Sequence, residues 1–193
     1  MNKLNIGCGD HPLEGWVNTD LNPCHPSIAR LDATQPFVFP DGYFDYVFSE
    51  HMIEHVPYEG GRAMLYECRR VLRPGGKIRI STPDLYFLIG LLGMPFSPIQ
   101  ARYVAWACQT FNPGVPVSPV VVLNNFVRCW GHQFIYTPSA LIELMHEAGF
   151  SDCRQRRIRE SDDPELRDLE NSGRMPPGFL QLETMTIEAE VPQ

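Results

Sequence analysis

Two glycines and two aspartates are spaced in a way that suits a nucleoside-like ligand. Gly7 and Gly9 directly follow a short apolar run, residues 4–6. Glycine has no Cβ, so the backbone can turn sharply there and approach a ligand closely. Asp20 and Asp32 each follow a further short run that is typical of a strand. One carboxylate can accept two directional hydrogen bonds from a ribose diol, and the other is placed to receive an exocyclic amine.

Each of these signals has an ordinary alternative when it is taken alone. A G-x-G triplet is a simple tight turn about as often as a ligand loop, and a lone aspartate is more often a turn residue or a helix cap. In a parallel sheet, however, the ends of neighbouring strands lie on one edge, where ligands bind. The combination therefore favours a nucleoside. Only ten residues separate Gly9 from Asp20, which leaves little room for a crossover helix.

The surrounding pattern predicts an α/β chain. Residues 58–73 repeat apolar side chains at helical spacing, and Pro74 with two glycines ends that helix before a strand at 77–82. This order implies parallel pairing with a right-handed crossover. A second helix begins after the capping residue Thr137 and ends at Gly149. The expected remaining strands are 4–6, 16–20, 28–31, 44–49, 153–159 and 180–191.

Residues 84–136 interrupt this alternation of strands and helices. The segment is apolar and proline-rich, with Asp84, Arg102 and Arg128 as its charged side chains. Helices are expected at 85–92 and 98–111, followed by a loop that Pro113, Pro116 and Pro119 punctuate. An apolar insertion of this kind is typical of a lid or binding segment. It is equally typical of a packing extension or of a dimer surface, such as that of a homodimer. We expect one domain, 1–193, with 84–136 as the insertion.

Bulk composition narrows the class of partner. The chain has 193 residues and a net charge of −7, which argues against nucleic acid and favours a small-molecule substrate. Its six cysteines form no C-x-x-C pair, so free thiols in a reducing compartment are expected. The most apolar run, residues 85–94, is too short to span a bilayer. With no targeting segment recognised, no membrane partner and a cytoplasmic location are expected.

Longer runs complete the pattern of a known family. They are Leu4-Asn5-Ile6-Gly7-Cys8-Gly9, Leu31-Asp32-Ala33, the stretch from Phe37 to Val47, Ser49-Glu50-His51-Met52-Ile53-Glu54-His55-Val56, and Glu67-Cys68-Arg69-Arg70-Val71-Leu72-Arg73-Pro74-Gly75-Gly76. With these runs the chain resembles the class I S-adenosylmethionine-dependent methyltransferases. It is similar to their compact bacterial members in the broad methyltransferase type 11, ubiquinone-biosynthesis-like family. The resemblance is close over residues 3–83 and resumes more weakly over 131–150.

The resemblance implies a fold, a cofactor and a set of site residues. The fold is Rossmann-like, with a mostly parallel seven-stranded sheet, an antiparallel C-terminal hairpin and a shortened first helix. The cofactor is S-adenosylmethionine, with S-adenosylhomocysteine as its product. The implied cofactor contacts are Gly7 and Gly9 for the methionine part, Asp20 for the ribose, Asp32 and Ala33 for the adenine, and Ser49, Glu50 and His51 around the sulfonium.

The chain departs from its relatives at one position of this loop. Where they usually carry an acid two residues before the first glycine, this chain has Asn5. Asp10 is the candidate to replace that acid, which neutralises the amino group of the cofactor.

Methyl transfer from a sulfonium is an in-line displacement that requires alignment and the exclusion of water. A general base helps when the acceptor is a hydroxyl or a protonated amine. The candidates are His51 and His132, with Glu54 behind them, although His132 suits a packed or surface position equally well. Oxygen, nitrogen and carbon acceptors all remain open.

Two alternatives belong to other functional classes. The chain can keep the cofactor fold without catalysis and act as a binding partner through its insertion. Residues 51–55 also fit the H-x-x-E-H zinc-peptidase pattern. That chemistry needs both histidines on one helix face and a third protein ligand. The run instead follows a strand, Pro57 comes soon after it, and the sequence offers no convincing third ligand, so no metal is expected.

Overall fold

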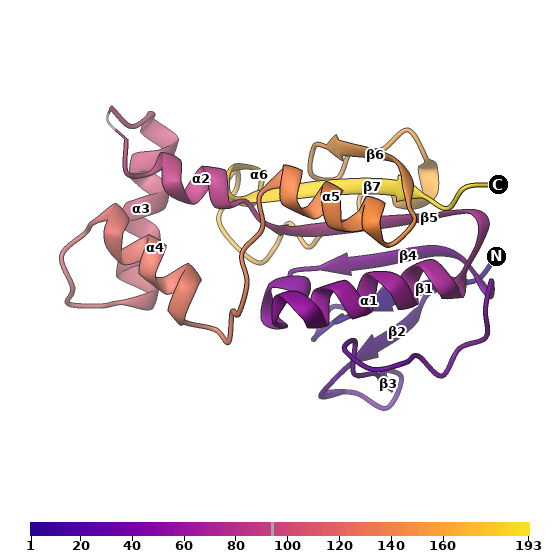
Figure 1. The fold of residues 1–193 in the computed structure, drawn as a ribbon. Helices are drawn as coiled ribbons and strands as arrows, with labels where there is room; N and C mark the ends of the chain where they lie inside the picture. Colours follow the sequence, from indigo (N-terminus) through magenta and orange to yellow (C-terminus); the bar gives the residue numbers. More distant parts are fainter. Residues whose placement is uncertain (94) are drawn as a thin grey trace.

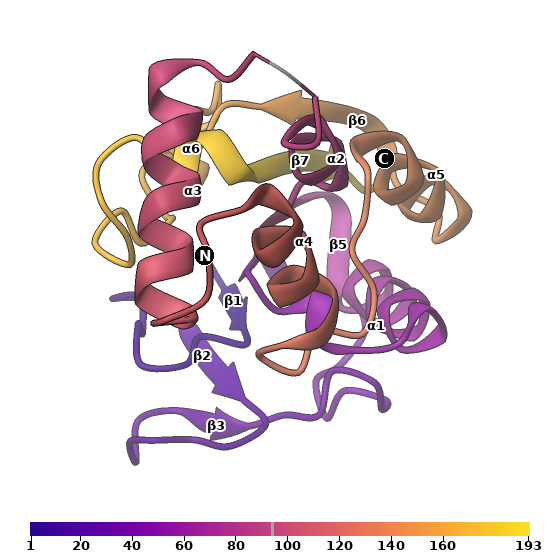
Figure 2. The same cartoon turned by 90° about the vertical axis from the view of Figure 1, so that its left-hand side faces the viewer.

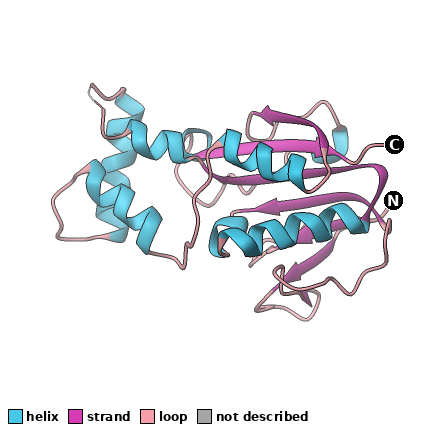
Figure 3. Cartoon of the chain, viewed as in Figure 1, coloured by secondary structure: helices cyan, strands magenta, loops and turns pink. Residues whose placement is uncertain are grey.

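The fold is a seven-stranded sheet in the order β3-β2-β1-β4-β5-β7-β6 (Figures 1 and 3). The computed structural model describes residues 1–93 and 95–193, so Met94, at the end of the apolar run 85–94, lies outside the described residues. The strands are β1 Lys3–Ile6, β2 Val17–Asp20, β3 Ala29–Arg30, β4 Phe44–Glu50, β5 Leu72–Pro83, β6 Ser151–Arg156 and β7 Thr184–Glu190. The helices are α1 Tyr58–Val71, α2 Leu85–Gly90, α3 Pro98–Phe111, α4 Pro119–Arg128, α5 Pro138–Glu147 and α6 Leu180–Glu183, with 3-10 turns η1 Ile53–His55 and η2 Pro164–Leu166.

Strand register brings the ligand-type residues to one edge. The first five strands pair in parallel, and Ile6 lies opposite both Thr19 and Ser49. The loop after β1, the end of β2 and the end of β4 therefore meet at the carboxyl edge of the sheet. β7 is antiparallel to both β5 and β6. The predicted mostly parallel sheet with an antiparallel C-terminal pair is confirmed.

The two faces of the sheet are covered differently. Helices α1 and α5 lie on one face (Figure 1), where Leu65 and Leu144 belong to a large buried apolar core. On the opposite face Arg79 is fully buried, and its guanidinium pairs with Glu170 at 2.6 Å and with Glu188 at 2.5 Å. Glu170 comes from the segment between β6 and α6. A buried ion pair is tolerated only when both charges are well partnered, so this segment is tied to the sheet.

Several local predictions need correction. Residues 119–128 form the helix α4 rather than part of a loop, because Ser118 caps it and Pro119 occupies its first turn, where proline is tolerated. The expected strand 180–191 begins with the short helix α6, and the strand expected at 153–159 ends at Arg156. The short crossover after β1 was expected, but the shortened first helix implied by the resemblance is not formed, since residues 7–16 make turns and loop. The helix expected at 98–111 matches α3.

The insertion stands beyond the carboxyl edge of the sheet. Helices α2, α3 and α4 project from the end of β5 and face the viewer in Figure 2. They enclose a second apolar core of their own, which includes Leu88, Tyr103 and Phe126. In the described part of the chain, no helix combines the length and the hydropathy that a bilayer crossing requires. The insertion therefore forms a helical layer next to the edge where the predicted site residues gather.

Candidate functional site

A first pocket of about 410 Å³ opens at the carboxyl edge of β1, β2 and β4. It brings together eight of the nine residues expected around a cofactor, namely Gly7, Gly9, Asp10, Asp20, Asp32, Ala33, Glu50 and His51. Ser49 is the exception. Its side chain is fully buried and its hydroxyl donates to the carbonyl of Ile6 at 3.1 Å. Ser49 thus links two strands rather than facing this pocket.

The two glycines of the loop after β1 have different structural roles. Both have positive φ angles, +71° at Gly7 and +54° at Gly9. A Cβ on Gly7 would lie 2.2 Å from Cγ of Met52, so Gly7 is required by protein packing. A Cβ on Gly9 would meet no protein atom within 4 Å. Because Gly9 lines the pocket, that empty space belongs to the ligand side, where close backbone approach is possible.

The carboxylate of Asp20 is held in place by the backbone around it. One oxygen accepts a hydrogen bond from the amide of Gly9 at 3.0 Å, and the other accepts from the amide of Asn22 at 2.8 Å. Each carboxylate oxygen retains capacity for a further donor. The arrangement orients Asp20 into the pocket at the end of β2, which suits the two hydroxyls of a ribose.

Asp32 is oriented by its own turn. One of its oxygens accepts from the hydroxyl of Thr34 at 2.7 Å and from the amide of Thr34 at 2.9 Å. These hydrogen bonds lower the pKa of the Asp32 carboxyl, which therefore stays ionised at neutral pH. The adjoining residue, Ala33, is buried at the wall of the pocket.

Asn5, which replaces the usual acid, is buried and donates to the side-chain oxygen of Asn18 at 2.9 Å. Asn18 in turn accepts from the amide of Leu13 at 2.8 Å, so the pair fixes the loop between β1 and β2.

The two acids Asp10 and Glu50 differ in burial. Asp10 is exposed on the pocket, whereas Glu50 is buried and both its oxygens lie 3.1 Å from the amide of Asn171. Glu50 is therefore the buried acid of this pocket.

A second pocket, of about 250 Å³, lies between the sheet edge and the insertion. It shares His51, His55 and Arg174 with the first pocket, so the two cavities adjoin. Its aromatic lining comes from α3, α4 and the turn after α4, and the buried acids Glu54 and Glu183 also face it. The aromatic residues are Tyr103, Trp106, Phe111, Phe126 and Trp130.

His51 stands at the boundary between the two pockets. It is a non-glycine residue with φ of +48°, a conformation that costs about 1–2 kcal/mol and is found at functional sites. Its Nε2 lies 3.0 Å from the hydroxyl of Thr184, and its Nδ1 lies 3.2 Å from Oε1 of Glu54. The imidazole is therefore fixed between a hydroxyl and a carboxylate.

Glu54 is fully buried. Its Oε2 accepts a hydrogen bond from the hydroxyl of Thr82 at 2.9 Å. Burial acts to raise the pKa of the Glu54 carboxyl, but the neighbouring His51 imidazole outweighs it and the pKa is lowered. Glu54 is accordingly a buried carboxylate that holds its negative charge next to an imidazole.

His132 belongs to the same cluster. Its Nδ1 lies 2.7 Å from the carbonyl of Phe126, which can only accept, so Nδ1 carries the proton and Nε2 has a lone pair. Burial lowers the pKa of His132, which keeps the ring neutral at neutral pH. His132 is therefore packed against α4 through the carbonyl of Phe126 and also lines the second pocket.

Sequence reasoning missed most residues of the second pocket, among them the polar residues Glu183, Tyr103 and Arg174. Glu183 is buried, its pKa is raised by burial, and it accepts a hydrogen bond from the hydroxyl of Tyr103. Arg174 is exposed at the rim of both pockets. In the sequence Glu183 falls within an expected strand and Tyr103 within an amphipathic helix, so neither carried a recognisable signal.

The H-x-x-E-H run does not form a zinc-peptidase helix. Residues 53–55 make a single 3-10 turn, and His51 precedes it in the left-handed conformation. His51 and His55 therefore do not lie one helical turn apart on an α-helix, which that chemistry requires.

Part of the chain is similar to known methyltransferases. Residues 15–80 match the family described as Methyltransferase domain. Over 72 residues the chain is 39% identical to the ubiquinone biosynthesis O-methyltransferase of Xanthomonas euvesicatoria pv. vesicatoria, a match that covers 37% of this chain and 26% of that enzyme. The match thus spans about a quarter of the curated relative.

Two solved structures share the fold over almost the whole chain. A SAM-dependent methyltransferase from Archaeoglobus fulgidus has a TM-score of 0.57 at 18% identity, with 98% of this chain and 85% of that chain covered. Phosphoethanolamine N-methyltransferase 2 of Haemonchus contortus, in complex with S-adenosyl-L-methionine, has a TM-score of 0.54 at 15% identity, with 100% of this chain and 49% of that chain covered. At these identities the likeness concerns the fold.

Proposed function

We propose that the chain is a class I S-adenosylmethionine-dependent methyltransferase, as its matched domain and its fold indicate, and that it methylates a small molecule bound in the second pocket. The single observation that carries the proposal is the meeting of the two pockets at His51, His55 and Arg174. A cofactor in one pocket and an acceptor in the other would face each other across that boundary.

The residues of the first pocket fit S-adenosylmethionine. The open space beside Gly9 admits close contact with the backbone, and the carboxylate of Asp20 is oriented for a ribose diol. Asp32 and Ala33 would contact the adenine at the end of β3. The cofactor supplies an activated methyl group and a neutral leaving group. Within this pocket we assign the methionine ammonium to Glu50, which is buried beside the loop, in preference to the exposed Asp10.

The second pocket suits an acceptor with a flat apolar body. Aromatic side chains supply most of its walls, and such walls favour planar or apolar ligands. Arg174 at the rim would pair with an anionic group of either ligand. A cavity of about 250 Å³ favours a small molecule over a macromolecular acceptor. The insertion, residues 84–136, would act as the lid that excludes water from the transfer.

Catalysis would depend chiefly on alignment, with proton removal as the second contribution. We assign His51 as the general base, because it stands at the boundary of the pockets with Glu54 beside it. His132, on the wall of the second pocket, would contact the acceptor and help to orient its hydroxyl or amine toward the methyl group. As the acceptor atom bonds to the methyl carbon, the carbon–sulfur bond breaks and His51 takes the proton released by the acceptor.

Calorimetric titration with S-adenosylmethionine and S-adenosylhomocysteine tests the cofactor assignment. Binding of both at one site is expected, and no binding at millimolar ligand would refute it. A labelled-methyl transfer assay against pools of small hydroxylated and amino compounds then tests the acceptor class. Cofactor binding without transfer to any pool, together with tight self-association through the insertion, would favour the non-catalytic binding protein.

A further inference from the structure

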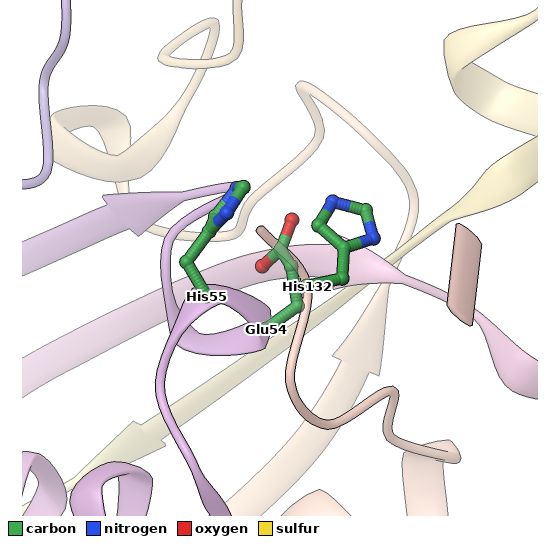
Figure 4. A group of neighbouring side chains, drawn as sticks. All are labelled: Glu54, His55 and His132. Atoms are coloured by element: carbon green, nitrogen blue, oxygen red, sulfur yellow. The ribbon is translucent and has the colours of Figure 1, made fainter. Parts of the chain in front are cut away.

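The cluster at the floor of the second pocket has the composition of a metal site. Glu54, His55 and His132 each offer one donor atom, and these atoms all lie within 4.8 Å of one another. Figure 4 shows the side chains of Glu54, His55 and His132 gathered at one place. One carboxylate with two imidazoles is a common ligand set for zinc and other divalent transition metals.

One oxygen of this cluster has no hydrogen-bond partner. Glu54 is fully buried, and although Nδ1 of His51 approaches Oε1 at 3.2 Å, Oε1 receives no aligned hydrogen bond among the described residues. A buried carboxylate oxygen without a donor is costly. A bound cation would satisfy that oxygen directly.

The surrounding structure holds two of the three donors, His132 and Glu54, in the state that a metal requires. The carbonyl of Phe126 accepts from Nδ1 of His132, which leaves Nε2 as the metal-binding atom. The hydroxyl of Thr82 donates to Oε2 of Glu54 and leaves Oε1 available. Such hydrogen bonds behind the ligands orient them and are characteristic of real metal sites.

The two segments that carry the ligands are tied to each other. The amide of Gln133 donates to the carbonyl of Glu54 at 2.7 Å, and the side-chain amide of Gln133 donates to the carbonyl of His55 at 2.7 Å. The imidazoles of His55 and His132 pack edge to face, with ring centroids 4.7 Å apart. The cluster is thus assembled by main-chain contacts between η1 and the turn after α4, independently of any one ligand side chain.

We propose that Glu54, His55 and His132 bind a divalent transition metal of the zinc type, with its open coordination position facing the second pocket. All three residues line that cavity, so a ligand there can reach the metal. Donor atoms around zinc lie about 3.4 Å apart for metal–ligand distances of about 2.1 Å. Binding therefore draws the donors together, and the half-buried His55 has the freedom to move inward.

The role of the metal rests on the proposed function, whereas its binding does not. An acceptor hydroxyl bound at the open position would lose its proton more readily, because a cation lowers the pKa of a bound oxygen acid. His51, outside the ligand set, remains to take that proton while the oxygen forms its bond to the methyl carbon. The site thus favours an oxygen acceptor over a carbon one and revises the expectation from sequence that no metal is held.

Zinc and cobalt(II) are the probes for this proposal. The chelator-treated full chain is titrated with Zn²⁺ by calorimetry, and bound metal is counted by elemental analysis after desalting. One equivalent is expected, and the visible spectrum of the Co²⁺ form should show imidazole and carboxylate coordination at a four- or five-coordinate centre. Zinc that is absent or present well below one equivalent would overturn the proposal.

Matched variants locate the ligands. His132→Gln and His55→Gln should each weaken Zn²⁺ binding about 10- to 100-fold or more. His51→Asn removes a neighbouring imidazole outside the ligand set and should keep the metal, as should His25→Asn on a distant exposed loop. Equal binding by all four variants, or loss in His51→Asn alone, would contradict the assigned ligand set.

Circular dichroism and denaturant unfolding check the folding of every variant, and S-adenosylmethionine affinity is measured separately on each. If His132→Gln fails to fold, His55→Gln decides the question, since the His132 imidazole is hydrogen-bonded to the carbonyl of Phe126 and its loss is the more disruptive of the two. Zinc binding that fails while cofactor binding and transfer persist rejects the metal alone. Zinc binding that persists while the cofactor fails to bind rejects the proposed function alone.

Discussion

The two pockets adjoin but are built in different ways. The first is formed at strand ends, where parallel register fixes the relative positions of Gly7, Asp20 and His51. The second is formed where η1, α3, the turn after α4 and the loop before α6 pack together. The difference shows that backbone hydrogen bonding at the sheet edge fixes the proposed cofactor site. The proposed acceptor site depends on how an apolar insertion packs against that edge.

Replacing the proposed general base, His51, should have the largest effect and tests its position at the boundary between the pockets. His51→Asn should lower kcat by about 10²- to 10⁴-fold, because general base catalysis typically contributes that much. Asparagine tolerates the left-handed backbone found at this position, so the fold should survive. The measurement is kcat with the acceptor found by screening, next to the affinity for S-adenosylmethionine. An unchanged kcat would remove His51 from the chemistry, with His25→Asn as the control.

The two glycines of the first pocket should separate packing from ligand contact. Gly7→Ala should lower the free energy of unfolding by about 2–5 kcal/mol, since both a positive φ and a clash with Met52 oppose the new methyl group. Gly9→Ala meets no protein atom and should cost about 1–2 kcal/mol from its φ angle alone. Denaturant unfolding measures both values.

Affinity should complete this contrast between the glycines. Gly9→Ala places its methyl group on the ligand side and should weaken binding of S-adenosylmethionine even where it remains folded. Adding Met52→Ala to Gly7→Ala should recover part of the lost stability by removing the clash. Equal destabilisation by the two single variants would contradict the assignment of separate roles.

Weakening the ribose contact proposed for Asp20 should have a smaller effect, confined to ligand affinity in the first pocket. Asp20→Asn should weaken S-adenosylmethionine binding by about 1.5–3 kcal/mol, or roughly 10- to 150-fold, because hydrogen bonds to a charged acceptor contribute about that much. Calorimetry measures the dissociation constant. Asp10→Asn is the matched control, since Asp10 lies on the same pocket but is exposed. A larger loss for Asp10→Asn would reverse the assignment.

Changing one aromatic residue in the wall of the second pocket should have the smallest effect, confined to KM for the acceptor. Trp130→Phe should raise KM for the acceptor about 2- to 10-fold, the range expected for the loss of about 0.5–1.5 kcal/mol of aromatic contact. The dissociation constant for S-adenosylmethionine should stay the same, since Trp130 lines only the second of these two pockets. Val38→Ala, at an exposed valine far from both pockets, should leave both values unchanged.

Much of the fold and of the first pocket was predictable from local signals. The helix expected at 98–111 agrees with α3, and β2 ends at Asp20 as expected, whereas β3 ends at Arg30, two residues before Asp32. The α4 segment was missed because Pro113, Pro116 and Pro119 indicate a loop, while the Ser118 cap makes Pro119 a helix start. Ser49 was placed in the pocket by its motif, yet its hydroxyl bonds Ile6 inside the sheet.

The sequence by itself determined which residues gather at the carboxyl edge of the sheet. Parallel pairing brings the ends of separated strands together there, independently of how the side chains pack. Only the tertiary structure decided that Glu54 meets His132, 78 residues further along, and that Glu183 meets Tyr103. Those meetings depend on the packing of α3 and α4 against η1 and α6, which apolar burial drives without regard to sequence distance. The chemistry of the second pocket is therefore a product of packing, and that of the first a product of register.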